Sequence, residues 1–405
     1  MNEEEKGADP RRAGLREIPA DYWRLWYVGL VAATVRWLET VAMGVVVYQQ
    51  TGSALIVAVN TMLRLLPMGL FGAVLGSLAE RFDRRLTLAG IIGLMGATSA
   101  TLAVIAWTGR LEVWHLMVAS FINGFGWATD NPLRRILMGE AMGRDRMAVA
   151  MAYDVGAANA SRFVGPTVGG LLLAGVGIEG MFSLSAAMYV TAVAATLLVR
   201  SRIPAAPGAS AVLARTWESI VITFADRRLN AIMIVTIIYN IFGWPYTSMI
   251  PVIGRDRLLL GPEGVGLMTS IDGFGAFVGA LALAMWLTPT WHARAYVGGV
   301  AVYLAGEIAF ALALSPLPAG AALLLIGLSG AAFSTLQATL VYLASPVEMR
   351  SRVMGVLSVC IGTGPIGFVW LGWLADRIGA PEATAITGAM GLTALAATWA
   401  MWRKI

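Results

Sequence analysis

The chain has 405 residues, of which 58% are hydrophobic and only 13% are charged. A soluble domain usually carries about 25% charged residues, so this composition excludes an ordinary soluble protein and favours one that lies in a membrane. The formal net charge is +5, but the sequence contains no aromatic and basic platform and no DNA-binding motif, which excludes nucleic acid as a partner. The single cysteine, Cys360, cannot form a disulfide within the chain.

Long apolar stretches follow one another along almost the whole chain. A transmembrane helix needs about 20 residues, and a sheet with open edges cannot satisfy its backbone polar groups in lipid. We therefore expect an all-α membrane protein. The twelve predicted transmembrane helices cover residues 22–49, 54–78, 86–108, 112–137, 147–175, 178–199, 229–252, 264–287, 294–315, 318–344, 351–374 and 382–402.

Basic residues indicate how these helices are oriented. Of the 29 Lys and Arg residues, 21 lie on the side of the two termini and four on the opposite side. Loops rich in Lys and Arg stay in the cytoplasm, so both termini are expected there, in a bacterial-type inner (plasma) membrane. Residues 1–21 are polar, and no cleavable signal is expected ahead of the first helix.

A polar stretch at residues 200–228 divides the helices into two sets of six. The starts of two corresponding helices, 206 residues apart, have weakly similar sequences: Arg146-Met-Ala-Val-Ala and Arg352-Val-Met-Gly-Val. Two parallel repeats would leave a similarity of this kind. The predicted parts are a cytoplasmic tail, an N-terminal six-helix bundle, a cytoplasmic linker and a C-terminal six-helix bundle, at residues 1–21, 22–199, 200–228 and 229–405.

The short charged loop from Gly76 to Arg85, after the second helix, carries the clearest motif. It resembles the signature loop G-x-L-a-D-R-x-G-R-R of the major facilitator superfamily (MFS), with Glu80 in place of the usual Asp and Asp83 in place of a Gly. The matching residues are Gly76, Leu78, Ala79, Arg81, Arg84 and Arg85. The resemblance implies twelve helices in two six-helix pseudo-repeats around a central cavity that opens to each side of the membrane in turn.

From its charges, this loop is predicted to act as a cytoplasmic latch between the halves. Glu80 can face the positively polarised N-terminus of a neighbouring helix, most simply the one at 351–374. The arginines of the loop are expected to pair with Asp130 or Glu140, and Asp154 is either another partner or a proton site. Alternatively, the arginines only anchor the topology. The residues assigned to the latch are Gly76, Glu80, Arg81, Asp83, Arg84, Arg85, Asp130 and Asp154.

The fifth predicted helix carries a second family resemblance. Its sequence is similar to the G-x-x-x-G-P-x-x-G-G motif of MFS antiporters, with Ser161 in place of the first Gly. The motif residues are Ser161, Gly165, Pro166, Gly169 and Gly170. Pro166 removes a backbone donor and bends or loosens the helix. The motif either seals an exporter against leakage or only packs closely, as glycines do in membrane bundles.

Three shorter segments resemble the MFS branch that includes bacterial siderophore exporters and macrolide-type efflux pumps. These segments are Tyr48–Ser53, Asn131–Arg134 and Arg350–Gly355. One mark of the family is missing, because Ser120 stands where an Arg often precedes Gly124 by four residues. The proton-transfer role of that Arg is therefore not carried over to this chain.

Four charged residues lie within the predicted membrane helices of the first half. Arg36 and Glu39, three positions apart, are expected to share a helix face and to pair. Together with Arg64 and Arg162, each costs at least about 2.5–3.5 kcal/mol unless it faces a cavity or a partner. The four form either a polar cavity in which Glu39 is the coupling carboxylate, or a structural ion-pair network. Further candidate proton carriers in the second half are Asp272 and Glu307.

Three arginines against one carboxylate leave an apparent charge of +2 near the mid-plane, which suits an anionic or acidic amphipathic solute better than a cationic one. Neutral residues that could bind it, each of which is more often a packing residue, are Asn60, Asn123, Asn159, Tyr239, Asn240, Trp244 and Gln337. His115 and His292 are isolated, so no metal site is expected. The sequence has no H-E-x-x-H, G-x-S-x-G or Walker A pattern, which argues against a hydrolase and an ATP-driven pump.

These features predict a secondary transporter without a cofactor, and not an enzyme. We expect a proton-coupled exporter of small amphipathic molecules, siderophore-like or drug-like, that works by alternating access. An importer or symporter of the same fold is one alternative. A non-transporting receptor or scaffold is another, although it would not explain the mid-membrane charges. The expected partners are a small-molecule substrate, protons and membrane lipids, and the protein is expected to be a monomer.

Overall fold

The computed structural model describes residues 18–79, 83–143, 146–200, 222–346 and 349–402. All regular structure in these ranges is helical. The chain is thus an all-α, integral, multi-pass membrane protein, as predicted. The stretches of described residues that are long and apolar enough to cross a membrane are Ala20–Thr51, Arg84–Trp107, Val149–Leu197, Arg227–Ser248, Pro262–Trp286, Pro289–Leu312, Pro316–Ala344 and Arg352–Ile378.

The helices of the N-terminal half follow the predicted segments closely. They are α1 (Ala20–Thr51), α2 (Ala54–Ala79), α3 (Arg84–Trp107), α4 (Val113–Met142) and α5 (Met147–Leu197). α5 contains the fifth and sixth predicted segments as two arms, because the backbone breaks at Gly177, with φ 71° and ψ 179°. Only glycine takes up such a conformation without steric cost.

The predicted segments of the C-terminal half were continuous, but two of them are broken in the structure. After α7 (Arg227–Ile238), the chain forms a π-helical turn η2 (Tyr239–Gly243), a 3-10 turn η3 (Trp244–Ser248) and α8 (Ile250–Asp256). Pro245 and Pro365 lack the N–H donor that a continuous helix needs, so the helical hydrogen bonds change register near them. The other helices are α9 (Pro262–Trp286), α10 (His292–Leu312), α11 (Pro316–Ala344), α12 (Arg350–Ile361), α13 (Gly364–Ile378), α14 (Ala380–Ala397) and α15 (Trp399–Trp402).

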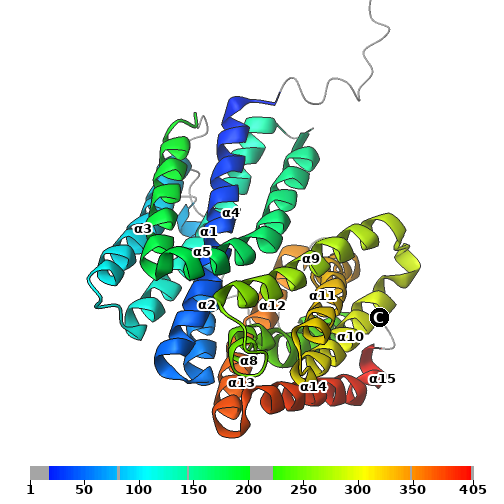
Figure 1. Cartoon of the computed structure of the whole chain (residues 1–405). Helices are drawn as coiled ribbons and strands as arrows, with labels where there is room; N and C mark the ends of the chain where they lie inside the picture. Colours follow the sequence, from blue (N-terminus) through cyan, green and yellow to red (C-terminus); the bar gives the residue numbers. More distant parts are fainter. Residues whose placement is uncertain (1–17, 80–82, 144–145, 201–221, 347–348, 403–405) are drawn as a thin grey trace, which may run out of the picture.

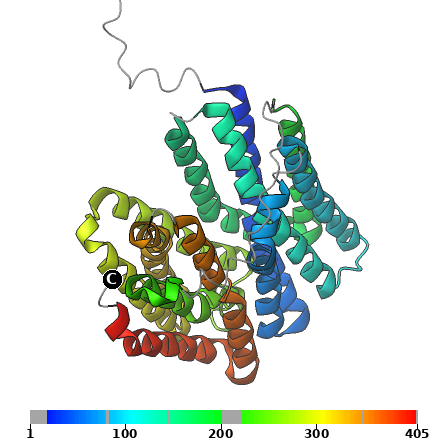
Figure 2. The same cartoon turned by 180° about the vertical axis from the view of Figure 1, so that it is seen from behind.

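Helices α1–α5 lie together, and helices α7–α15 lie together beside them (Figures 1 and 2). We call these sets the N-terminal group and the C-terminal group. We call the end at which α1 passes into α2, at residues 51–54, the distal end. The opposite end, where α1 begins, is the terminal end. α2 and α13 pack against each other where the two groups meet (Figure 1).

One hydrophobic core joins the two groups toward the distal end. It combines Val47 and Phe182 of the N-terminal group with Phe310 of the C-terminal group. Toward the terminal end, a second core around Tyr22 belongs only to the N-terminal group, and a third around Tyr296 only to the C-terminal group. Among the described residues, apolar burial therefore ties the groups together at the distal end and not at the terminal end.

Small residues let α5 of one group and α9 of the other approach at their backbones. A Cβ atom on Gly273 would lie 2.5 Å from the carbonyl oxygen of Arg162. A Cβ on Gly266 would collide with the carbonyl of Pro166, and one on Gly170 would collide with the first turn of α9. Close approach of this kind is how membrane helices associate without a hydrophobic driving force.

The remaining residues of the helix-five motif face α1 within the N-terminal group. A Cβ on Gly165 would lie 2.7 Å from Trp37 Cβ, and one on Gly169 would lie 2.9 Å from the backbone of the next residue of α1. The hydroxyl of Ser161 donates to the carbonyl oxygen of Ala157 at 2.9 Å. The motif thus serves two close-packed interfaces, one within its group and one between the groups.

Candidate functional site

Glu39 lies within α1, and its carboxylate is fully buried inside the N-terminal group. Its Oε1 accepts a hydrogen bond of 2.6 Å from Ser99 of α3, and its Oε2 accepts one of 2.8 Å from Asn123 of α4. Ser120, three residues before Asn123, donates to Asn60 of α2 at 2.8 Å. Buried polar groups need such partners. Four helices of one group therefore enclose Glu39 in a neutral polar cluster.

The predicted pair between Arg36 and Glu39 is wrong. The Arg36 guanidinium lies over Trp127 of α4, with Cζ 4.7 Å from the ring centroid, where the aromatic face attracts it. Both residues lie in the described part of the chain, and no nitrogen of Arg36 comes within 4.0 Å of the Glu39 carboxylate. Neutral donors on α3 and α4 satisfy the carboxylate instead.

Arg36 and Arg64 retain donors that no described group accepts. Arg64 Nη1 donates to the backbone carbonyl of Arg36 at 3.2 Å. Arg36 Nε and Arg64 Nη2 are buried, and neither has a hydrogen-bond partner within the described ranges. An unmet buried donor of a charged group is costly, and any hydrogen-bond acceptor that reached it would reduce that cost.

Arg162 joins the two groups and does not belong to an ion-pair network of the first half. From α5, its Nη2 donates to Asp272 Oδ2 of α9 at 2.8 Å. The hydroxyl of Tyr246 donates to the other oxygen of Asp272 at 3.0 Å. The Asp272 side chain is 7% exposed and that of Arg162 is 36% exposed, so the carboxylate is enclosed while the arginine is partly exposed. This ion pair crosses the interface at which the glycines bring α5 and α9 together.

The helix break after α7 positions Tyr246 beside Asp272. Irregular helical turns often mark functional positions, and here η2 and η3 replace regular helix over residues 239–248. Tyr239 stacks on Phe333 of α11 with ring centroids 3.6 Å apart, and Tyr303 of α10 lies 5.6 Å from Tyr246. An aromatic layer therefore backs Asp272 on the C-terminal side.

The neutral residues predicted to line a cavity fall into two sets. Asn60 and Asn123 belong to the cluster around Glu39. Asn240 donates to the backbone carbonyl of Thr236 at 2.8 Å, and Gln337 donates to the Thr236 hydroxyl at 3.1 Å. These four are buried and bonded within their own group. The half-buried members of the predicted set are Asn159, Tyr239 and Trp244.

Glu307 of α10 is also fully buried, but its surroundings differ from those of Glu39. Neither of its oxygens has a hydrogen-bond partner in the described part of the chain. It faces α14, where its Cδ lies 3.6 Å from the place of a Cβ on Gly388. The hydroxyls of Thr384 and Thr387 on the same helix are likewise buried and without described partners. No cluster of His, Cys, Asp and Glu able to hold a metal ion occurs among the described residues.

Three of the charged residues assigned to the latch form ion pairs inside the N-terminal group, namely Arg84, Asp130 and Asp154. Arg84 pairs with Glu140, as predicted. Asp154 pairs with Arg134 and, at 3.2 Å, with Arg135, and not with Arg84 of the loop. These two arginines lie on α4, which packs against α5, the helix that carries Asp154.

The other latch residues have local roles or lie outside the described residues. Asp130 pairs with Arg134 one turn further along α4, at 3.5 Å, and not with Arg84 or Arg85 as predicted. Asp83 accepts a hydrogen bond of 2.9 Å from the backbone of Leu86 and caps α3. Arg85 donates to the carbonyl of Val199 at 3.1 Å. Gly76 lies in α2, and Glu80 and Arg81 are outside the described residues.

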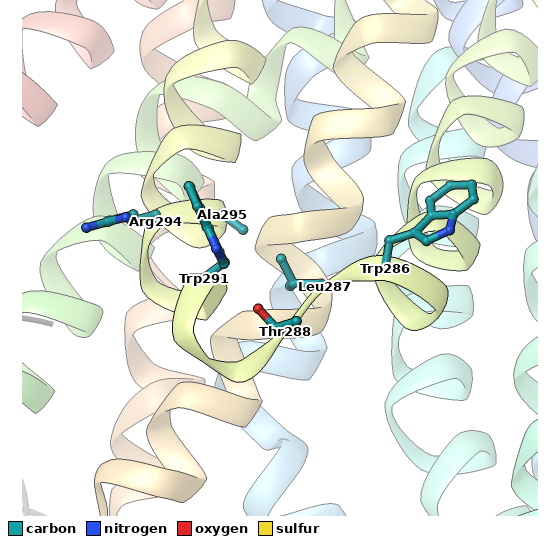
Figure 3. Close-up of a pocket in the computed structure, with 6 residues that line it drawn as sticks. All are labelled: Trp286, Leu287, Thr288, Trp291, Arg294 and Ala295. Atoms are coloured by element: carbon teal, nitrogen blue, oxygen red, sulfur yellow. The ribbon is translucent and has the colours of Figure 1, made fainter.

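A cavity of about 540 Å³ lies at the turn between α9 and α10, apart from all of these residues (Figure 3). Its lining residues are Trp286, Leu287, Thr288, Trp291, Arg294 and Ala295. Arg294 lies 5.0 Å from the Trp291 ring, and both Trp side chains are exposed. Tryptophan and arginine at such a place are typical of anchors at a membrane surface, so this cavity is not our candidate transport site.

Sequence reasoning missed three residues that touch the charged groups. Ser99 and Trp127 look like ordinary members of apolar helices, and no signal in the sequence separates them from their neighbours. Tyr246 had one signal, because Pro245 in an apolar segment indicates a helix break.

A multi-pass helical protein with charged side chains buried within two groups of membrane helices has the architecture of a transporter. Residues 18–403 match the model of a family described as transmembrane secretion effectors, and the chain belongs to this family of the MFS. It is therefore a membrane-embedded transporter of a small molecule, and not an enzyme.

Curated relatives cover most of the chain. Macrolide efflux protein A of Streptococcus pyogenes is 23% identical over 373 residues, which is 88% of this chain and 91% of the relative. The multidrug efflux pump Tap of Mycolicibacterium fortuitum is 26% identical over 87% of this chain and 88% of its own length. The staphyloferrin A transporter of Staphylococcus aureus is 21% identical over 87% and 89%. These names place the chain in the efflux and siderophore branch of the superfamily.

Solved structures share the fold. A POT peptide transporter in complex with sulfate matches with a TM-score of 0.80 at 13% identity, over 98% of this chain and 99% of the other. A mutant of the nucleoside transporter NupG matches with a TM-score of 0.73 at 14% identity, over 94% and 99%. At this identity the likeness concerns the fold alone.

Proposed function

We propose that the chain is a proton-coupled exporter of small acidic amphipathic molecules, siderophore-like or drug-like, that works by alternating access. The observation that carries this proposal is the ion pair between Arg162 and Asp272, which links the two groups of helices within the membrane. The names of the efflux relatives support export. Import by a transporter of the same fold is the competing hypothesis.

Twelve membrane crossings in two halves of six are part of the proposal. The two arms of α5 on either side of Gly177 supply two crossings, α7 with α8 supplies one, and α12 with α13 supplies one. α4 and α14 are long enough to complete the set with the remaining helices. The charge distribution then supports two cytoplasmic termini, in a bacterial-type inner membrane, with residues 200–228 as a cytoplasmic linker. We propose that the transporter works as a monomer.

We propose that the cargo binds through an anionic group near Arg36 and Arg64. Both guanidinium groups have buried N–H donors without described partners, and Trp127 supplies an aromatic face beside Arg36. A carboxylate or similar anion could accept from these donors and would neutralise part of the positive charge. The half-buried side chains of Asn159, Tyr239 and Trp244 are proposed to contact the less polar part of the cargo.

We propose Asp272, and not Glu39, as the principal coupling carboxylate. Glu39 is held by neutral donors from one group of helices, so its protonation has no direct effect on the other group. Protonation of Asp272 would remove the charge that holds Arg162 and would weaken the contact between α5 and α9. Protonation of Asp272 would thus be coupled to the separation of the two groups, as proton-driven alternating access requires.

The test is transport in proteoliposomes that contain the purified protein. A thermal-shift screen of siderophores, dyes, antibiotics and lysolipids first selects a bound cargo. An exporter that exchanges cargo for protons should accumulate that cargo in vesicles with an acidic interior, and a protonophore should stop accumulation. Accumulation only in vesicles with an acidic exterior would show symport. Binding without any flux in either gradient would reject the transporter mechanism in favour of a receptor or scaffold.

A further inference from the structure

Asp376, near the end of α13, bonds to the first turn of α2 in the other group of helices. Its Oδ1 accepts hydrogen bonds from the backbone N–H groups of Ala54, at 2.6 Å, and Leu55, at 3.2 Å. Its Oδ2 accepts one of 2.6 Å from the hydroxyl of Ser53. The hydroxyl oxygen of Ser53 in turn accepts from the backbone N–H of Ile56 at 3.2 Å.

These bonds meet a specific need of α2. The first four N–H groups of a helix have no partner within the helix, and its N-terminus favours negative charge. Ser53 satisfies one of these donors from its own chain segment, as an N-cap residue does. Asp376 satisfies two more from 322 positions away and supplies the negative charge. The start of one helix is therefore capped across the interface between the groups.

Close packing holds the two elements together beside this cap. A Cβ on Gly372, one turn before Asp376, would lie 2.8 Å from Leu55 Cα, so the backbones of α13 and α2 touch. A second bond joins the groups at the same end, between Tyr48 of α1 and Asp256 of α8. Toward the terminal end, in contrast, the described cores of the two groups are separate.

The residues around Asp376 repeat the charged motif that follows the second helix. Gly372-Trp-Leu-Ala-Asp-Arg377 has the order G-x-L-A-acid-R, which is also the order of Gly76-Ser-Leu-Ala-Glu-Arg81. Residues 372–377 lie in the last turns of α13, which packs against α2 across the interface. Residues 76–81 begin in the last turn of α2. The chain therefore places the same acidic hexad at the ends of both helices of this pair, although only the hexad at Asp376 lies entirely within the described residues.

We propose that Asp376 is a positioning residue for transport, which holds the distal end closed through its bonds to Ser53, Ala54 and Leu55. We call these four residues the distal latch. The inference rests on the proposed alternating-access function, because the distal end must open for cargo to pass. Opening separates α13 from α2, breaks the three bonds and leaves the start of α2 without its acidic cap. The latch thereby favours the state in which only the terminal end is open.

Distances between the groups at the distal end test this proposal. Nitroxide labels at Thr108→Cys and Leu314→Cys, in a Cys360→Ala background, lie on exposed turns of the N-terminal and C-terminal groups. Double electron–electron resonance should give a short distance as the main population. Asp376→Ala should raise the ratio of long to short distances about fivefold, the size expected for loss of a helix cap at an exposed residue. Asp376→Asn, which keeps an acceptor, should give a smaller rise.

Glu112→Ala is the matched control, because Glu112 caps α4 at the same end but within one group. It should leave the distances unchanged. If Asp376→Ala does not fold, Ser53→Ala replaces it in the test. Ser53→Ala removes one bond of the latch and leaves Asp376 in place, and it should shift the distances in the same direction. Unchanged distances in folded Asp376→Ala, or an equal shift in Glu112→Ala, would overturn the latch. Absence of flux in the wild-type protein would instead reject the proposed transport function, while the distances would still decide the latch.

Discussion

Glu39 and Asp272 are both carboxylates buried among membrane helices, yet they are held in different ways. Glu39 accepts hydrogen bonds from neutral side chains of its own group of helices. Asp272 is paired with Arg162 of the other group and accepts a hydrogen bond from the hydroxyl of Tyr246. Burial alone therefore does not identify a coupling residue. In the proposed mechanism, protonation of Asp272 affects the movement because its partners lie on both sides of the interface between the two groups.

The strongest test of this comparison is Asp272→Asn. The amide resembles a permanently protonated carboxyl, so we expect proton-driven flux to fall to background while exchange of labelled for unlabelled cargo continues. Both rates can be measured in the same proteoliposomes. The matched variant Glu39→Gln should keep proton-driven flux. If Glu39→Gln abolishes that flux and Asp272→Asn preserves it, the assignment is reversed.

The second prediction concerns the interface that carries Asp272. Gly266→Ala should lower the transport rate by at least about tenfold, because its Cβ would collide with the backbone of Pro166, and overpacking costs about 1–3 kcal/mol. Gly298→Ala on α10 is the control, since no described atom lies within 4 Å of its new Cβ. Equal rates in the two variants would show that the close contact of α5 with α9 is not needed for transport.

The third prediction concerns cargo binding on the N-terminal side. Arg64→Ala should weaken binding of an acidic cargo about tenfold, because a charge-assisted hydrogen bond contributes about 1.5–3 kcal/mol. Isothermal titration of the detergent-purified protein measures this loss. A neutral analogue of the same cargo should bind the variant and the wild type alike. An equal loss for both ligands would mean that Arg64 supports the fold and does not recognise charge.

The smallest expected effect separates Glu39 from Glu307 by stability. Glu39→Gln should lower the melting temperature by a few degrees, because one of its two accepted hydrogen bonds is lost or reversed, at about 1 kcal/mol. Glu307→Gln should not lower it, since no described partner depends on the carboxylate and the amide carries no charge to bury. Thermal unfolding in detergent compares the two. A larger loss for Glu307→Gln would point to a partner of that carboxyl.

Several features of the fold were predictable from the sequence because they depend on local patterns. Apolar runs of about 20 residues have one stable state in lipid, so the membrane helices and most of their limits follow from composition. The ion pair of Arg84 with Glu140 also followed, because Arg84 begins one of two neighbouring antiparallel helices and Glu140 lies near the end of the other. The motif at Gly76–Arg85 indicates the superfamily through its residue order alone, and the family match confirms that prediction.

The partners of buried charges were predicted less well. Spacing along α1 suggested that Arg36 would pair with Glu39, but spacing shows only which residues share a face and not what that face meets. In the structure, α3 and α4 offer neutral donors to Glu39 and an aromatic face to Arg36. Likewise, Asp130 and Asp154 both pair with Arg134 of α4, a partner that the spacing of the motif did not indicate.

The sequence by itself thus determined that the chain crosses the membrane as helices, which residues place charge within them, and the superfamily to which it belongs. These are properties of single segments, set by hydrophobicity, backbone hydrogen bonding and short motifs. Only the tertiary structure decided that Arg162 meets Asp272 and that Asp376 caps α2, because these partners are 110 and 322 positions apart. Contacts of that kind depend on how whole helices pack, and close approach at glycines such as Gly273 and Gly372 makes them possible.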